Sequence, residues 1–291
     1  MNTDAVTTDA DTTATPDLGQ FGVWRGGFLK SKAAKAIEDL GYGTIWIGGS
    51  PPADLLAVEK VLAATESIMV ATGIVNIWTA AATDIAETYH RFEQQYPGRF
   101  LLGIGVGHPE QPGLNYSKPY SALVEYLDVL DEHGVPENRR VLAALGPKVL
   151  ELSATRAAGA HPYLTTPEHT RQARELLGSA LLAPEQKVVL DDNPARARVP
   201  GRDAVNNPYL QLKNYVNNLR RLGYPEQEIV DGGSDRLIDD LVAHGNAQQI
   251  AARLNEHVTA GADHVAIQVL PASDNPVPTL TALAETLKLR R

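Results

Sequence analysis

The chain of 291 residues contains no cysteine, which excludes disulfide bonds, thiolate metal ligands and thiol nucleophiles. It also lacks a basic stripe: its formal net charge is −9, and its densest arginine groups, at 196–202 and 220–221, are short. A protein that binds nucleic acid without sequence preference needs such a stripe, so we expect no nucleic-acid partner. No apolar run approaches the roughly 18 residues that a membrane span requires, and we expect no membrane association.

Several catalytic and cofactor motifs are missing as well. No H-x-H or H-E-x-x-H arrangement occurs, so we expect no metal. No G-x-S-x-G elbow supports a serine hydrolase. No G-x-G-x-x-G opens the first expected helix, which counts against a dinucleotide-binding, doubly wound sheet. The adjacent Asp191 and Asp192 resemble a carboxylate pair, but neighbouring residues point to opposite sides, which favours the start of a loop or helix.

The first seventeen residues are rich in threonine, alanine and aspartate. They have neither the cationic region nor the apolar core of a signal peptide, so we expect a cytoplasmic protein. Residues 1–17 are predicted to form a disordered acidic tail, and residues 18–291 a single domain.

From residue 21 onward, strand-like runs alternate with helix-like runs. The apolar, β-branched runs expected to form strands lie at 21–24, 44–47, 68–75, 100–106, 140–145, 160–164, 187–190 and 265–269. Helices are expected at 31–40, 54–65, 83–96, 119–132, 147–158, from 167, at 206–222, 235–244 and 246–260.

Eight strands that alternate with helices predict a (β/α)8 TIM barrel, with a doubly wound open sheet as the alternative. The longest stretch between expected strands is 191–235, after strand seven. Its first part, Asn193 to Pro208, is rich in proline, arginine and glycine, and we expect it to form an insertion or lid on the active-site side.

Small residues follow the third and fourth expected strands. The third run leads into Gly73-Ile74-Val75-Asn76, and the fourth into Gly105-Val106-Gly107-His108. Ligands bind at the carboxyl ends of strands in α/β proteins, and glycine allows a ligand to approach the backbone closely. A histidine at this edge suits acid–base chemistry because imidazole titrates near neutral pH.

Five segments carry a resemblance to a known family. They read GTIWIGG (43–49), ATGIVNIW (71–78), PGRFLLGIGVGH (97–108), GAHPYL (159–164) and GADHVAIQ (261–268). Taken together over 21–289, the chain resembles the bacterial luciferase-like monooxygenase superfamily. Within that superfamily it resembles the branch of oxidoreductases that use the deazaflavin coenzyme F420.

The resemblance implies where the coenzyme ring would lie. The family's third strand ends in a non-prolyl cis peptide, which falls here on Gly73–Ile74; an ordinary trans strand end is the alternative. Ile74 would then back one face of the ring, with Val75, Asn76, Gly105 and Gly107 nearby. His108 would stand beside the reacting carbon as acid or base, or else cap a loop or contact the coenzyme without catalysis.

The resemblance also implies a phosphate site and a substrate pocket. Relatives hold the phosphate near strand six, which here reads Gly159-Ala160-His161, and at the helix start Thr165-Thr166. Lys30 and Lys32 are candidates for an anionic tail, although surface lysines are commonly only solvated. Trp78 is expected to line the substrate pocket. Trp46 is a second candidate, with simple filling of the barrel interior as the alternative.

One departure from the family bears on the reaction. Many hydride-transferring relatives carry histidine at the end of strand two, where this chain has Gly48-Gly49-Ser50. Ser50 can donate a hydrogen bond but does not shuttle protons at neutral pH. The resemblance therefore implies an F420-dependent reductase acting on a small organic molecule. An FMN-dependent monooxygenase and a non-catalytic coenzyme-binding barrel are the alternatives, and relatives suggest a homodimer.

Overall fold

The computed structural model describes residues 15–108 and 116–289. Most of the tail predicted over 1–17 therefore lies outside the described residues.

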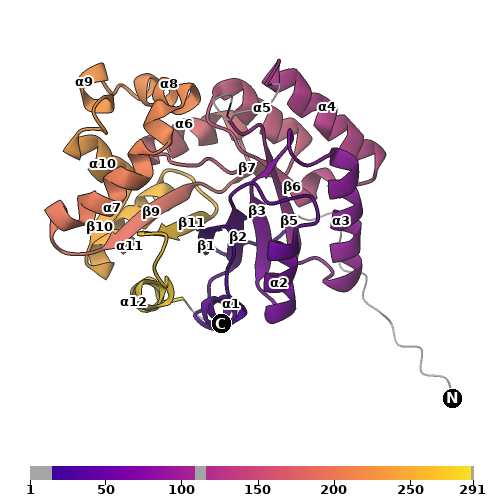
Figure 1. Ribbon diagram of the computed structural model, residues 1–291, viewed down its shortest axis with the longest axis horizontal. Coiled ribbons are helices and arrows are strands. Elements are labelled where there is room, and N and C mark those ends of the chain that lie inside the picture. Colours follow the sequence, from indigo (N-terminus) through magenta and orange to yellow (C-terminus); the bar gives the residue numbers. More distant parts are fainter. Residues whose placement is uncertain (1–14, 109–115, 290–291) are drawn as a thin grey trace.

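The strands and helices alternate through most of the chain (Figure 1). The strands are β1 (Phe21–Gly26), β2 (Thr44–Gly48), β3 (Met69–Gly73), β4 (Val75–Asn76), β5 (Phe100–Gly105), β6 (Arg140–Leu142), β7 (Gly159–Ala160), β8 (Leu181–Leu182), β9 (Glu185–Leu190), β10 (Val242–Gly245) and β11 (Val265–Val269). The α-helices are α1 (Ser31–Asp39), α2 (Leu56–Ala64), α3 (Ala82–Gln95), α4 (Pro119–Glu132), α5 (Pro147–Arg156), α6 (Pro167–Leu177), α7 (Pro194–Asn206), α8 (Lys213–Arg221), α9 (Glu226–Ile229), α10 (Asp235–Leu241), α11 (Ala247–Thr259) and α12 (Val277–Leu287). Two short 3-10 turns, η1 (Glu137–Arg139) and η2 (Tyr209–Gln211), complete the set.

The strands form one curled sheet. Their order is β10-β9-β11-β1-β2-β3-β5-β6-β7-β8, with β4 attached to β5, and the paired strands are parallel. The chain passes from β8 directly into β9, and its backbone there bonds to both sides. Glu185 N donates to Pro162 O at 2.8 Å, and Ala266 N donates to Pro184 O at 2.9 Å. The sheet thus curls back on itself in the manner of a TIM barrel, and the predicted α/β class is confirmed.

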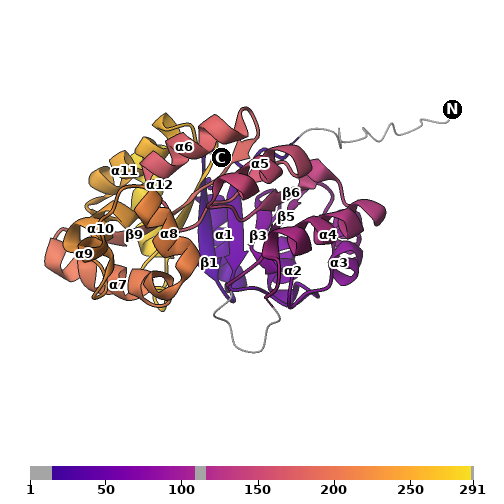
Figure 2. The same cartoon turned by 90° about the horizontal axis from the view of Figure 1, so that it is seen from above.

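Successive strand residues face different layers. On β2, Ile45 and Ile47 join the large apolar cluster between the sheet and the helices, whereas Trp46 packs in a second cluster with residues of the other strands. This second cluster fills the curled interior, as the two-residue period of a strand requires. Figure 2 shows helices on both flanks of the strands.

Helix prediction succeeded where the apolar period was clear. In α4, the aligned residues Leu123, Tyr126, Leu127 and Leu130 are all buried. In α11, the side chain of Asn246 accepts from Gln249 N at 3.0 Å while Gln249 Oε1 accepts from Asn246 N at 2.9 Å. This reciprocal pair is a capping box, and it begins the helix expected at 246–260. Among the described residues, none of the helices combines the length and apolarity needed to cross a membrane.

The segment after β9 differs from its prediction. Asn193 to Pro208 is mostly the helix α7, because Asn193 caps it by accepting from Arg196 N at 3.1 Å and Pro194 suits its first turn. The helix expected at 206–222 begins only at Lys213. Figure 1 shows α7 to α10 gathered at one end of the molecule, far from α2 and α3.

Two strand assignments and one helix assignment are also corrected. The strand expected at 160–164 is only β7, because Pro162 cannot donate to a ladder. The strand expected at 187–190 starts earlier, at Glu185, as β9, and the short strand β8 before it was not expected. The helix expected at 235–244 ends at Leu241, and Val242–Gly245 forms β10 on the edge of β9. That pairing joins residues about fifty positions apart, which no local pattern reveals.

Candidate active site

Four neighbouring strands end in glycine at one edge of the sheet. Gly26, Gly48, Gly73 and Gly105 are the last residues of β1, β2, β3 and β5. Gly26 pairs in register with Gly48, and Gly48 with Gly73. Because the strands are parallel, these residues form a ledge without side chains, the glycine ledge, at the carboxyl edge of the sheet. We call this edge the mouth; it is where ligands bind in α/β proteins.

Two side chains require the glycines of this ledge. A Cβ atom at Gly48 would lie 2.0 Å from Trp24 Cζ2, and one at Gly73 would lie 2.6 Å from Trp24 Nε1. A Cβ atom at Gly105 would lie 2.9 Å from Ile74 Cδ1. Trp24 and Ile74 therefore occupy the volume that side chains on the ledge would need, and they give the mouth a flat apolar wall.

The peptide bond between Gly73 and Ile74 is cis, which confirms the expectation drawn from the resemblance. The chain then resumes as β4, where Val75 and Asn76 pair with β5. Val75 is buried between the sheet and the helices, and Asn76 Oδ1 accepts from Trp78 N at 3.0 Å. These two residues, predicted to bind the coenzyme, attach the chain that follows the cis peptide bond to β5.

His108, the predicted catalytic residue, lies at the mouth among tyrosines. Its ring centroid is 5.6 Å from that of Tyr215 in α8 and 6.4 Å from that of Tyr209 in η2. Tyr209 is 5.3 Å from Tyr163, which in turn is 5.0 Å from Trp24. These five rings form a continuous aromatic belt from β5 to β1, and the insertion after β9 supplies two of them.

An ion pair lies next to the aromatic belt. Glu185 and Lys187 alternate on β9, are fully buried, and approach to 3.2 Å. Lys187 Nζ is 3.9 Å from the ring centroid of Tyr163, whose hydroxyl donates to Gln268 Oε1 at 2.8 Å. Burial raises the pKa of Tyr163 well above its ordinary value, so this phenol is protonated at neutral pH and can donate.

Aromatic and imidazole rings fill the interior below the mouth. Trp46 is fully buried and stacks on His161 with ring centroids 4.0 Å apart. Its Nε1 donates to His264 Nε2 at 3.0 Å. Burial lowers the pKa of His161 to about 3 and that of His264 to about 4, so both rings are neutral. Trp46 is thus buried in the curled interior.

Two buried nitrogens beside Gly73 have no hydrogen-bond partner among the described residues. They are Trp24 Nε1, a donor, and His161 Nε2. His161 Nδ1 donates to Ala183 O at 2.6 Å, which leaves Nε2 as an acceptor. A donor and an acceptor beside the wall formed by Trp24 and Ile74 fit a planar heteroaromatic ring whose edge carries both kinds of group.

The residues predicted to hold a phosphate lie together around β7 and the start of α6. Gly159 and Ala160 are buried within the sheet, and Thr166 caps α6 by accepting from His169 N at 3.3 Å. The hydroxyl of Thr165, also buried, has no partner among the described residues. An unsatisfied hydroxyl beside a helix N-terminus fits an anion, although Thr166 already occupies part of that terminus.

The remaining predicted site residues lie at the strand ends. Ser50 follows β2 with a left-handed backbone (φ 52°), and Gly107 precedes His108 with φ 59°. Trp78 is half-buried; its Nε1 donates to Val106 O at 2.8 Å, and its ring lies 5.5 Å from that of Tyr116. Trp78 therefore stands at the end of β5, on the same edge as His108.

Sequence reasoning missed most of the aromatic belt and the ion pair. The alternation of Glu185 and Lys187 before an expected strand was a usable signal, because charged residues on one strand face are rare inside a sheet. Tyr209 and Tyr215 carried no comparable signal, since they reach the mouth only through the path of the insertion.

Comparisons with known proteins agree with this geometry. The model of the luciferase-like monooxygenase family matches residues 31–133. An F420-dependent secondary alcohol dehydrogenase, solved with an F420-acetone adduct, superposes with a TM-score of 0.70 at 14% identity, over 94% of this chain and 99% of its own. The F420-dependent tetrahydromethanopterin reductase of Methanopyrus kandleri gives 0.65 at 15% identity, over 93% and 99%.

A flavin enzyme is similar to the same degree. The oxygenating constituent of 3,6-diketocamphane monooxygenase from Pseudomonas putida, in complex with FMN, gives a TM-score of 0.68 at 13% identity, over 93% of this chain and 97% of its own. A search of curated protein sequences finds no match. The family-model match over residues 31–133 confirms the resemblance to the luciferase-like monooxygenases, and the superpositions show that the fold is shared with both F420-dependent and FMN-dependent enzymes.

Proposed function

We propose that this chain is an F420-dependent oxidoreductase built on an eight-stranded barrel, and that it acts as a reductase on a small organic substrate. The observation that carries the proposal is the position of His108, which stands at the mouth within the aromatic belt that also includes Trp24 on the glycine ledge. The likeness to two F420-dependent enzymes over more than nine-tenths of the chain supports it.

Different residues at the mouth would contact different parts of such a coenzyme. Ile74, which covers part of the glycine ledge, would back a flat ring, while Trp24 Nε1 and His161 Nε2 would bond its edge. Thr165 would contact the phosphate. When bound in its reduced form, the deazaflavin supplies a hydride from C5.

The chain itself then positions the substrate and handles the proton. His108 would give a proton to the substrate atom that becomes basic as the hydride arrives. Tyr163, whose hydroxyl donates to Gln268 Oε1, would line the pocket beside the substrate. The aromatic belt excludes water from the reacting atoms, which strengthens the hydrogen bond from His108 to the substrate.

The coenzyme is identified by titrating the purified chain with F420, followed by fluorescence, and separately with FMN, followed by absorbance. We expect saturable binding of F420 alone. Binding of FMN alone, with oxygen consumed in turnover, would replace the proposal with a monooxygenase. Binding of neither would refute it.

The role of His108 is tested with His108→Gln, which keeps the size of the side chain but cannot transfer a proton. We expect coenzyme affinity to change less than about twofold while kcat falls about 100-fold, the usual contribution of a general acid. His133→Gln, at an exposed histidine after α4, is the matched control and should behave as wild type. Full activity in His108→Gln would remove His108 from the mechanism.

A further inference from the structure

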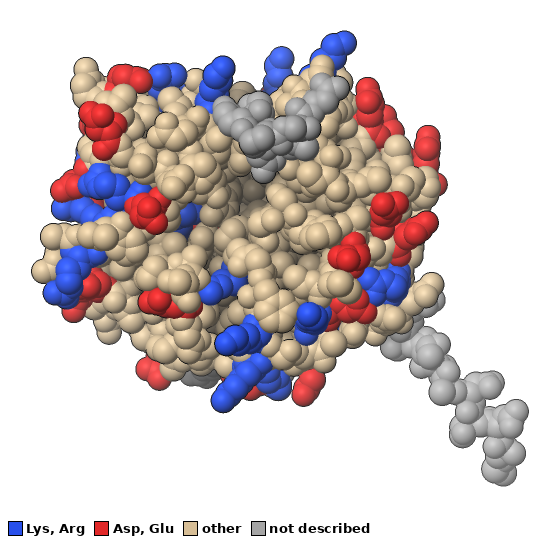
Figure 3. All heavy atoms as spheres, viewed as in Figure 1, with Lys and Arg blue, Asp and Glu red and all other residues tan. Residues whose placement is uncertain are grey.

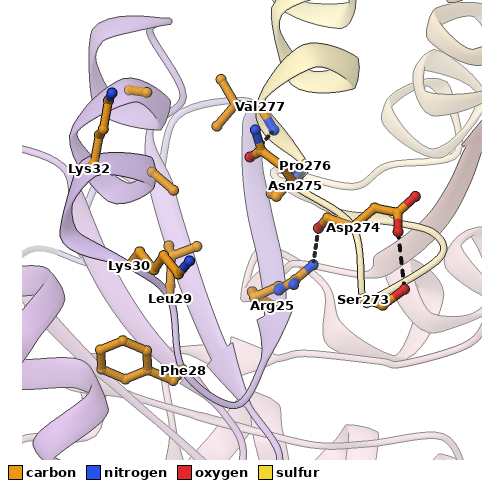
Figure 4. Close-up of a pocket in the computed structure, with 12 residues that line it drawn as sticks. Arg25, Phe28, Leu29, Lys30, Lys32, Ser273, Asp274, Asn275, Pro276 and Val277 are labelled. Carbon is orange, nitrogen blue, oxygen red and sulfur yellow. Dashed lines mark hydrogen bonds between the residues drawn. The ribbon is translucent and has the colours of Figure 1, made fainter.

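A cavity lies beside the mouth, on the outer side of β1. It has a volume of about 480 Å³ and opens between the starts of α1 and α12 (Figure 4). On β1, Trp24 points to the interior, whereas the next residue, Arg25, points to the opposite side and lines this cavity. The strand itself therefore separates the cavity from the aromatic belt. Its volume lies within the roughly 300–1,000 Å³ of small-molecule sites.

The cavity has apolar walls. Phe28 and Leu29 from the loop after β1, Ala33 and Ala36 from α1, and Val277 from α12 line it. Phe28 is 56% exposed, which is unusual for a phenylalanine, and Lys60 Nζ lies 4.7 Å from its ring centroid. A ligand with a flat or aliphatic body would cover these surfaces and remove them from water.

The rim of the cavity is cationic. Arg25, Lys30 and Lys32 line it, against a single carboxylate, that of Asp274. Arg25 Nη1 donates to the backbone oxygen of Asp274 at 3.3 Å, while the Asp274 carboxylate accepts from the Ser273 hydroxyl at 3.1 Å. The chain as a whole carries −9, so this excess of positive charge is local. Figure 3 shows Lys and Arg atoms gathered over the part of the molecule where Figure 1 places α1.

The backbone at the rim also favours an anion. Helix α1 begins at the cavity with Lys30 as its N-cap; among the described residues no side chain caps it, and its first turn contains no acidic residue. The first N–H groups of a helix carry a partial positive charge. This partial charge has the same sign as the charges of Lys30 and Lys32. The backbone and the side chains at the rim therefore favour the same kind of ligand.

From this combination we infer a binding site for a small organic anion: a phosphate or carboxylate group held by Arg25 and Lys30, with Lys32 adding positive charge at the rim, and an aromatic or aliphatic body against Phe28 and Ala36. Neither half of the site is sufficient alone, because exposed lysines bind bare anions weakly and the apolar walls do not select for charge. The site does not rest on the proposed coenzyme or on His108.

Phenyl phosphate is the probe, and phenol and inorganic phosphate represent its two halves. Isothermal titration of the full chain should show saturable binding of phenyl phosphate at least about tenfold tighter than either half, since both kinds of contact are then made together. Equal affinity for inorganic phosphate would show a bare ion site and overturn the inference. Equal affinity for phenol would show that charge plays no part, and would overturn it too.

Two variants locate the binding. Lys32→Gln should weaken phenyl phosphate by about fivefold, the value of one partly exposed charge contact. Its matched control is Lys148→Gln, because Lys148 also occupies the second position of a helix, α5, which lacks an acidic first turn but does not line the cavity. Equal losses in the two variants would mean that any lysine at a helix start suffices, which contradicts the inference.

Ala36→Phe fills the cavity and leaves all three cations in place. It should abolish binding while thermal melting shows a folded chain; retained binding would place the probe elsewhere. A final titration in the presence of saturating F420 separates this site from the mouth. Unchanged phenyl phosphate affinity supports a second ligand site, whereas displacement by F420 would assign the cavity to the coenzyme and overturn the inference.

Discussion

Two buried carboxylates occupy opposite sides of the sheet and are held in different ways. Glu38 on α1, in the outer layer, accepts hydrogen bonds from the backbone N–H groups of residues 66–68 at 2.7–3.1 Å. Glu185 on β9, in the curled interior, faces Lys187 at 3.2 Å. Backbone N–H groups therefore stabilise the charge of Glu38, whereas the buried charge of Lys187 stabilises that of Glu185.

The pKa values record this difference. Burial alone would raise the pKa of Glu38, but the backbone N–H groups overcome it and lower that pKa to about 2. Burial raises the pKa of Glu185 and lowers that of Lys187, and their mutual attraction offsets this only in part. The outer carboxylate thus satisfies the backbone N–H groups of the loop before β3. The interior pair is costly, and apolar residues of similar volume would replace it without loss of stability.

The difference points to different purposes. Glu38 ties α1 to the chain before β3 and is needed for the fold. Glu185 and Lys187 lie beside Tyr163 at the mouth, so we attribute the pair to the site, where it fixes the surroundings of the aromatic belt. Three changes test this contrast.

The largest effect is expected from Lys187→Met. It leaves Glu185 buried without its partner and should lower the free energy of unfolding by about 4 kcal/mol, measured by urea denaturation. The double variant Glu185→Met/Lys187→Met should return to within about 1 kcal/mol of wild type but not regain kcat. If the double variant were as unstable as Lys187→Met, the ion pair would be needed for stability. Full activity of the double variant would show that the ion pair plays no part in the site.

A smaller loss is expected from Glu38→Ala. Removing the carboxylate leaves several backbone N–H groups buried without an acceptor, which should cost about 3 kcal/mol in urea denaturation. Adding Lys35→Ala should not rescue stability, because Lys35 Nζ is only one of several donors to Glu38. The matched control is Glu66→Gln, at an exposed partner of Lys35, which should change stability by less than about 0.5 kcal/mol. If Lys35→Ala restored the stability lost in Glu38→Ala, Glu38 would be held by a charged partner, as Glu185 is, and the two carboxylates would not differ.

The smallest effect is on the pH dependence of stability. Because the folded-state pKa of Glu38 is depressed to about 2, its contribution is fully present above its ordinary pKa of 4.5 and is lost as pH falls from there towards 2. Between pH 6 and pH 3 the wild type should lose about 2 kcal/mol through this group. Glu38→Gln cannot titrate, so its urea-denaturation stability should fall less over this interval. Parallel pH profiles would show that Glu38 is not held as described.

Prediction from sequence was accurate where burial on one face sets the pattern. The helices expected at 119–132 and 246–260 form as α4 and α11, because the apolar stripe of the first and the Asn246–Gln249 capping pair of the second join neighbours three and four positions apart. His108 was placed at the carboxyl edge of the sheet because it follows a strand that is apolar throughout. Prediction failed for α7, where Asn193 and Pro194 form a cap signal that the proline and glycine content of the segment obscured.

By itself, the sequence determined the alternation of strands and helices, the layer that each strand residue faces, and the glycines at four strand ends. These depend on periods of two and about 3.6 residues and on backbone freedom, which are local properties. Only the tertiary structure decided that Trp24 covers Gly48 and Gly73, and that Tyr209 and Tyr215 meet His108. It also decided that Arg25 and Lys32 share a cavity with α12. Those contacts join residues far apart in the chain, and they exist because the sheet curls until its distant strands meet.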